Sequence, residues 1–104
     1  MGLNNQYEFI FDKRLGIKIP SLKKEWDDYT ELEQLEIIHL WELERAKIPD
    51  KVKNMENKIE NLQDLIFDID FDDYLKIHEQ IVDLSSAIND LNIWYRTSGE
   101  LNKE

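Results

Sequence analysis

The chain has 104 residues, which is enough for one folded domain and too few for two of ordinary size. It contains no cysteine, which excludes a disulfide framework, a thiolate metal site and a thiol nucleophile. A formal net charge of −10 argues against binding along a nucleic-acid backbone. No apolar run approaches the ~20 residues that cross a bilayer. We therefore expect a cytoplasmic protein that binds neither nucleic acid nor membrane.

The charge is unevenly distributed along the chain. Residues 1–24 contain five basic and two acidic side chains, a net charge of +3, so the other eighty residues carry −13. Residues 25–44 contain eight acidic side chains and no lysine or arginine. Acidity of this kind keeps a protein in solution, and a concentrated acidic segment also suits a basic partner. Few glycines and prolines indicate a mostly helical chain.

The first predicted element is a short helix over residues 3–15. Tyr7, Ile10 and Arg14 recur at helical spacing. Gly16 stands where a helix stop is expected. The same residues include an alternating Tyr-Glu-Phe-Ile-Phe stretch that fits a short strand, but no partner strand is evident elsewhere in the sequence. The helix is therefore the favoured interpretation, followed by a connection through Pro20.

A second helix is predicted from Glu31 to about Lys47. Thr30 and Glu33 match a capping box, in which each side chain bonds the backbone N–H of the other residue. Pro49 interrupts the helical ladder, and the sequence leaves open whether the chain turns or only kinks there. One apolar face of this helix consists of Leu32, Leu35, Ile38 and Trp41. The apolar surface is widened by Ile37, Leu40 and Leu43.

Two apolar stripes with spacings of three and four residues predict two further helices, over about 50–68 and 73–97. The short acidic link between them requires antiparallel neighbours, with Leu62 near Ile81. The stripes are Val52, Met55, Ile59, Leu62, Ile66 and Ile69, then Tyr74, Ile77, Ile81, Leu84, Ile88, Leu91 and Tyr95.

The predicted fold class is all-α: a coiled-coil-like antiparallel helical hairpin within a small three- to four-helix bundle. The helix that begins at Glu31 is expected to cover the hairpin, because two helices alone leave much of their stripes wet. The chain then forms a single helical domain. In it, residues 1–29 pack across the bundle, residues 30–98 form the helical core, and residues 99–104 form a frayed tail.

The acidic link resembles a calcium-binding loop in its spacing. Asp68, Asp70, Asp72 and Glu79 occupy positions one, three, five and twelve of an EF-hand loop. The sixth position, which must turn sharply and is normally glycine, is Asp73. We therefore expect an acid-capped turn and no metal.

No other constellation predicts chemistry. The two histidines, His39 and His78, lack the further ligands that a zinc site needs. Three glycines at widely separated positions cannot form a phosphate-binding loop, and no serine lies in a nucleophile-elbow motif. We expect no catalysis and no cofactor.

Apolar and aromatic side chains exceed what a small bundle can hide, which favours an interaction surface. Trp94 has an alternative role, packing under the N-terminal aromatic residues of its own chain. The sequence thus predicts a non-catalytic protein–protein interaction module that self-associates, as a homodimer, or acts as an adaptor. The alternative is an acidic inhibitor or antitoxin-like decoy of a basic partner. The candidate interface residues are Ile37, Leu40, Trp41, Leu43, Ile93, Trp94 and Arg96.

Overall fold

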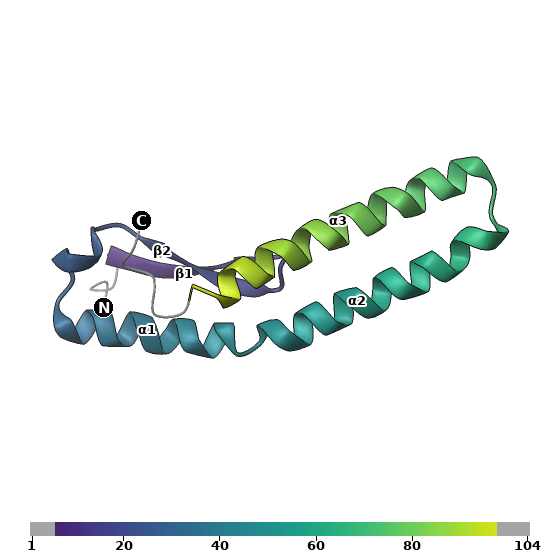
Figure 1. Cartoon of the computed structure of the whole chain (residues 1–104). Helices are drawn as coiled ribbons and strands as arrows, with labels where there is room; N and C mark the ends of the chain where they lie inside the picture. The colour runs from purple at the N-terminus through teal and green to yellow at the C-terminus, as the bar shows by residue number, and fades with distance from the viewer. Residues whose placement is uncertain (1–5, 98–104) are drawn as a thin grey trace.

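The chain begins with two antiparallel strands, in a computed structural model that describes residues 6–97 (Figure 1). Strand β1 (Tyr7–Asp12) pairs with strand β2 (Ile17–Leu22), and the register runs from Tyr7 opposite Leu22 to Asp12 opposite Ile17. The helix predicted over residues 3–15 is therefore wrong where the structure describes it. The alternating Tyr-Glu-Phe-Ile-Phe stretch is a strand, and its partner lies immediately after the turn.

Gly16 closes the turn between the strands. Its φ of +79° lies in the left-handed region that glycine adopts without steric cost. The Gly16 backbone N–H donates to the Asp12 carbonyl oxygen at 2.7 Å, and the Leu15 N–H donates to the Asp12 side chain at 3.0 Å. The glycine that resembled a helix stop is thus the last residue of a hairpin loop.

Helix α1 (Glu31–Arg45) begins at the predicted capping box. The Glu33 N–H donates to the Thr30 hydroxyl oxygen, and the Thr30 N–H donates to the Glu33 carboxylate. A 3-10 turn, η2 (Trp26–Asp28), leads into this helix from β2. Helix α1 packs against β2. It was expected to cover the pair of helices formed by residues 50–68 and 73–97, but its apolar face is covered by the sheet instead.

The buried face of α1 differs from the predicted one. Ile37 and Trp41 are almost completely buried, whereas Leu32 and Leu35 are 70% and 63% exposed. Both faces repeat at helical spacing, because α1 is apolar around much of its circumference. Periodicity therefore located the stripes without deciding which one meets the sheet.

Pro49 kinks the chain without reversing it. Ala46 and Lys47 keep right-handed helical dihedral angles, and helix α2 (Ile48–Leu65) starts with Pro49 in its first turn. Proline is tolerated there because its missing N–H would have no partner in the helix. As a result α1 and α2 run end to end as one bent helical path (Figure 1).

Helices α2 and α3 form the antiparallel pair that the stripes predict (Figure 1). A short 3-10 turn, η3 (Ile66–Asp68), ends α2, and α3 (Phe71–Tyr95) follows. Asp70 caps α3 by accepting the Asp73 N–H at 3.0 Å, so the helix begins two residues earlier than expected. The predicted tail at residues 99–104 lies outside the described residues.

The predicted three- to four-helix bundle is wrong. The molecule has a mixed α/β head, formed by residues 6–45, and an arm, formed by α2, η3 and α3, that projects from it (Figure 1). It measures 58 × 25 × 21 Å with a radius of gyration of 18.0 Å, well above the ~13 Å of a compact chain of this size. Helix α1 cannot cover the arm because it continues away from it.

Two apolar clusters hold the head and its junction with the arm. One, inside the head, centres on Tyr7, Tyr29 and Ile37. The other joins head to arm and includes Trp41, whose ring meets that of Trp94 edge-on at 5.4 Å. Its remaining buried members are Leu15, Ile17, Ile48, Ala87 and Leu91.

Candidate functional site

The outer part of the arm has no core of its own. We call residues 56–86 the distal arm; they include the end of α2, the link and most of α3. Every residue from 49 to 86 remains at least partly exposed, and the next buried residue in the chain is Ala87. A pair of helices that shares only one seam is marginally stable in water. The distal arm is therefore the part of the described chain most in need of a cover.

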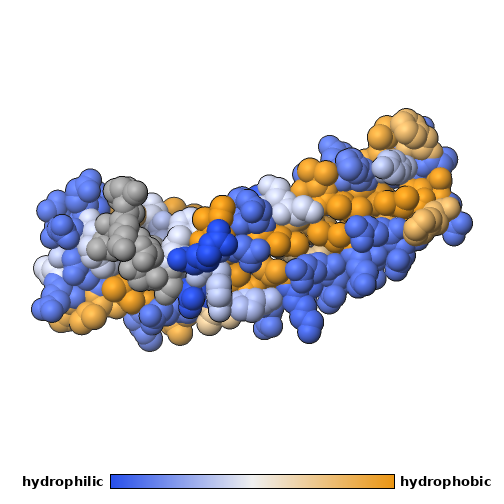
Figure 2. Space-filling model, viewed as in Figure 1, coloured by the Kyte–Doolittle hydropathy of each residue, from blue (hydrophilic) through white to orange (hydrophobic). Residues whose placement is uncertain are grey.

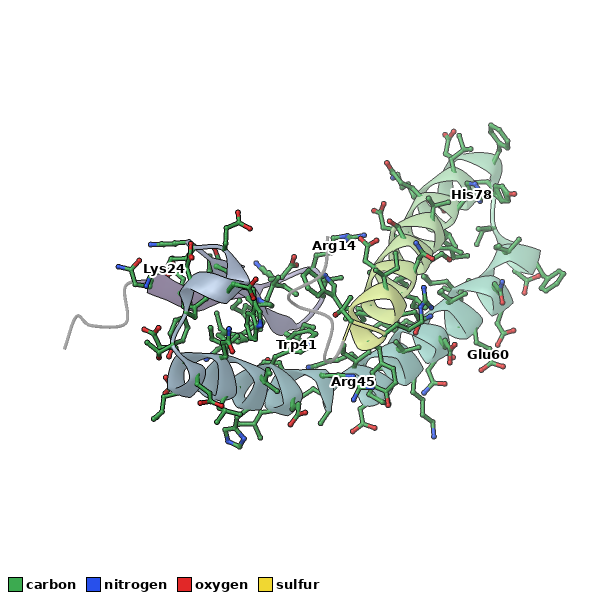
Figure 3. The ribbon with its side chains drawn as sticks, turned by 60° about the vertical axis from the view of Figure 1, so that its left-hand side comes forward. Arg14, Lys24, Trp41, Arg45, Glu60 and His78 are labelled. Carbon is green, nitrogen blue, oxygen red and sulfur yellow. The ribbon has the colours of Figure 1, made fainter. Side chains whose placement is uncertain are left out.

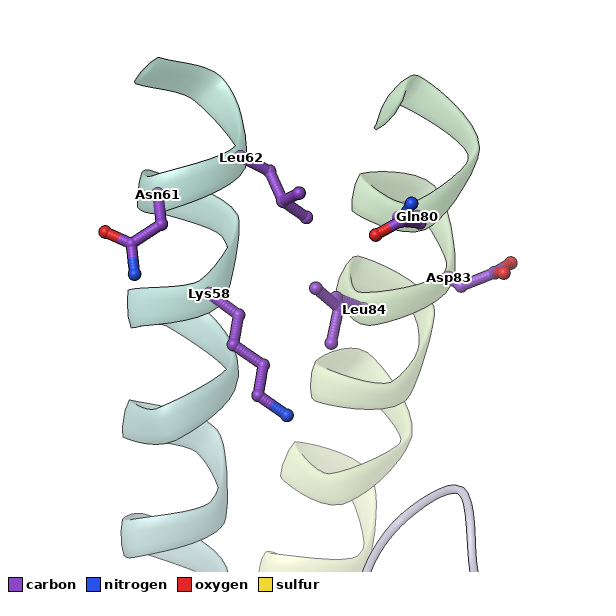
Figure 4. A pocket seen from close by; sticks show the side chains of 6 residues that line it. All are labelled: Lys58, Asn61, Leu62, Gln80, Asp83 and Leu84. Carbon is purple, nitrogen blue, oxygen red and sulfur yellow. The ribbon is translucent and has the colours of Figure 1, made fainter. Parts of the chain in front are cut away.

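The seam between α2 and α3 is open as a groove of about 500 Å³ midway along the arm. Leu62 and Leu84 point into it from opposite helices, and the aliphatic stem of Lys58 lies across it, while Asp83 points away (Figure 4). A groove with an apolar floor and charged edges is typical of a protein contact surface. Nothing in this lining supplies a nucleophile with an adjacent base.

Large apolar side chains stand out along the same arm. Phe67 is 86% exposed, the highest value among the large apolar residues of the described chain, and Phe71 is 70% exposed. Figure 2 shows an apolar band that continues along the arm between α2 and α3. Apolar surface that is contiguous in this way usually marks an interaction site. The other strongly exposed members on the arm are Leu65, Leu75, Val82 and Ile93.

Three rings are stacked along the first turns of α3. Phe71 lies parallel to Tyr74 at 6.3 Å, and Tyr74 lies parallel to His78 at 6.0 Å. Because aromatic side chains have few rotatable bonds, they lose little entropy when a partner packs on them. The stack gives a rigid aromatic surface to the end of the arm next to the link, which we call the tip.

Charge changes sign along the arm. Residues 59–85 contain eight acidic side chains and one basic one, a net charge of −7. Residues 45–55, where the arm meets the head, contain four basic side chains and one acidic side chain, a net charge of +3. We call residues 45–55 together with 87–97 the waist. The arm is thus acidic at its tip and basic on the α2 side of its base.

The predicted interface residues separate into two groups. Ile37 and Trp41 are buried in the chain's own clusters, Leu40 packs against the head cluster, and Trp94 packs on Trp41. Trp94 therefore contributes to the junction, with Trp41 as its ring partner. The exposed candidates are Leu43, Ile93 and Arg96, the first 53% and the second 45% exposed.

The calcium-loop residues do not converge on one point. Asp70 is occupied as the cap of α3, whereas Asp72 and Glu79 lie on the helix itself. Within residues 6–97, no three histidine or acidic side chains are placed to share a metal ion. His39 is exposed on α1, and His78 belongs to the ring stack on α3, toward the end of the arm that is far from the head (Figure 3).

Phe67, Phe71, Leu75 and Val82 were not among the predicted interface residues. Phe67 falls off the α2 stripe and Phe71 falls off the α3 stripe, which already signals side chains that do not face the seam. The spacing of the aspartates in the link predicts a turn, but it does not indicate whether Phe67 and Phe71 are exposed. The stripe of Leu75, Val82 and Ile93 is readable from the sequence at helical spacing, although its exposure is not.

A scan of protein-family models and searches of curated proteins and of solved structures each found no match to this chain. No helix in the described residues is long and apolar enough to cross a membrane.

Proposed function

We propose that this chain is a non-catalytic protein–protein interaction module of the cytoplasm that acts by self-association. The observation that carries the proposal is the distal arm, which has a half-open seam and strongly exposed apolar side chains without a buried core. Burying apolar surface stabilises a complex by about 25 cal/mol per Å² before the cost of association is subtracted. Each exposed phenylalanine of the tip is therefore a strong contributor to binding.

Sedimentation equilibrium over a wide concentration range tests the proposal. We expect mass above the 12.5 kDa of one chain at high concentration. Replacing Phe67 and Phe71 by serine should weaken association by at least about tenfold, because an aromatic anchor typically supplies more than 1 kcal/mol. The same change should alter the monomer's unfolding free energy by only about 0.5 kcal/mol, since both side chains are exposed.

Leu32 and Leu35 supply the matched control. They are also strongly exposed, but they lie on α1 in the head. Replacing both by serine removes a similar apolar area and should leave association unchanged. A strict monomer at millimolar concentration would count against self-association, and equal loss in both double variants would show that the arm is not the contact surface.

An acidic decoy for a basic partner is the second candidate. It draws support from the concentration of charge in two separate segments, residues 25–44 and residues 59–85, with a basic stretch between them. Binding of this kind should weaken steeply with added salt. Titration with a polybasic peptide tests it, and unchanged affinity between 50 mM and 500 mM salt would remove its basis.

A further inference from the structure

We propose that the partner of the arm is the arm of a second copy, laid antiparallel, so that each acidic tip covers the basic side of the other copy's waist. This inference rests on the self-association proposed above and specifies its geometry. A twofold axis crossing the arm at its middle produces such a pair, in which each contact occurs twice. The two arms then stack face to face, two helices on two, so that each arm covers the half-open seam of the other.

The charge along the arm selects this orientation over the parallel one. A parallel pair places two segments of net charge −7 side by side, at Asp64, Asp68 and their neighbours. An antiparallel pair places each of these segments opposite a segment of net charge +3, which includes Lys53. Like charges brought together across an interface are unfavourable, and complementary charges set both the orientation and the rate of association.

The dimensions of the arm suit a dimer. Helix α3 has 25 residues, which span about 37 Å at 1.5 Å per residue. Two helices side by side are about 20 Å wide, so one face of the arm projects roughly 700 Å². A stable interface buries about 800 Å² of accessible surface on each partner. Complete overlap of two arms therefore provides nearly all of the required area, and partial overlap does not.

The absence of cysteine gives a clean background for a crosslinking test. Asp68→Cys marks the tip, and Lys53→Cys marks the waist; both positions are exposed. The two single variants are mixed at equal concentration and treated with a short bismaleimide linker. We expect crosslinks between the tip of one copy and the waist of the other, at least about tenfold more than between two tips.

A charge exchange tests the same geometry without a linker. Lys53→Glu with Arg96→Glu changes the net charge of the waist from +3 to −1, and Asp64→Lys with Asp68→Lys changes that of the tip from −7 to −3. Each pair should raise the dimer dissociation constant by about tenfold, because several surface charge pairs worth up to ~1 kcal/mol are each lost twice. Combining all four substitutions leaves −1 facing −3, which repels less than the −1 facing −7 of the waist variant alone, so the fourfold variant should bind more tightly than the waist variant although less tightly than the wild type. Lys23→Glu with Lys24→Glu makes the same charge change in the head and should have little effect.

The outcomes separate this inference from the proposal beneath it. Dimers that crosslink tip to waist, and that bind more tightly in the fourfold variant than in the waist variant, support both. Dimers that crosslink tip to tip, or whose dissociation constant is unchanged by the charge substitutions, overturn the antiparallel geometry and leave self-association standing. A monomer at all concentrations, with wild-type helical circular dichroism, overturns both.

Discussion

Glu44 is the one acidic side chain buried in the described chain, and it fastens α1 to the sheet. Its carboxylate accepts the Lys18 backbone N–H at 2.9 Å and the Lys47 ammonium at 3.0 Å. Burial by itself raises the pKa of this carboxyl group, but these two hydrogen bonds and the nearby lysine charges outweigh burial and hold the pKa below its ordinary value. The ionised form is therefore the one that the fold stabilises.

The pH dependence follows from the direction of that shift. A carboxyl group whose pKa is lower in the folded state contributes stability above its unfolded pKa and loses it as pH falls through the folded pKa. Glu44→Gln should cost about 1–3 kcal/mol at pH 7, since it leaves the buried hydrogen bonds poorly matched. The deficit relative to the wild type should shrink toward pH 3. Urea unfolding at pH 7 and at pH 3 measures the deficit in unfolding free energy. An equal deficit at the two pH values would contradict the lowered pKa of Glu44.

Tyr7 shows the opposite behaviour in the head. Burial, followed by a hydrogen bond to the Glu36 carboxylate, raises its pKa from 10.0 to about 12. The neutral phenol is the form that donates this hydrogen bond, so this contribution to stability is present below pH 10 and is lost as pH rises toward 12. This hydrogen bond joins β1 to α1, whereas the one between Lys18 and Glu44 joins β2 to α1. Each strand therefore has its own polar link to the helix.

At the scale of elements, the β-hairpin depends on Gly16. A residue with a side chain would have to adopt the left-handed conformation at this position, which costs about 1–2 kcal/mol. Its β-carbon would also meet the flexible Lys51 side chain at 3.3 Å. Gly16→Ala should therefore lower the unfolding free energy by that amount. Gly16→Asn should cost less, because asparagine tolerates the left-handed region. Thermal unfolding followed by circular dichroism compares the two, and equal losses would contradict a conformational cause.

Local signals predicted several elements correctly because they are complete within a few residues. The capping box at Thr30 fixed the start of α1, and the two stripes placed α2 beside α3. The sheet was missed because its strands are short and one contains Pro20, which lies opposite Phe9 in the register. Pro20 is accommodated at the edge of a two-stranded sheet, where a missing N–H need not break a ladder.

The interaction surface was only partly predictable, for a related reason. Helical spacing shows that α1 and α3 each carry more than one apolar stripe. Leu43 belongs to the second stripe of α1, and Ile93 belongs to the second stripe of α3. Which stripe is buried depends on where the rest of the chain packs, and that information is not local. Once a sheet occupied the Trp41 side of α1, the opposite leucines were left in solvent, and α1 was no longer available to cover the arm.

At the scale of the whole molecule, the head should be more stable than the distal arm. Within residues 6–97, all buried residues lie in the head or at its junction with the arm. Regions with few buried apolar contacts open with lower free energy than the core. In hydrogen–deuterium exchange at low protein concentration, backbone amides of residues 56–86 should exchange at least about tenfold faster than those around Trp41. Raising the concentration should slow the arm selectively, and an arm as protected as α1 in the monomer would contradict this view.

The helical dihedral angles at Ala46 and Lys47 have a mechanical consequence. Lys47 links the two helices, because its N–H donates to the Glu44 carbonyl oxygen in α1 and its own carbonyl oxygen accepts the Lys51 N–H in α2. The molecule therefore has the shape of an angled strut with a longest dimension of 58 Å. The head and the outer end of the arm are separated along this one bent path.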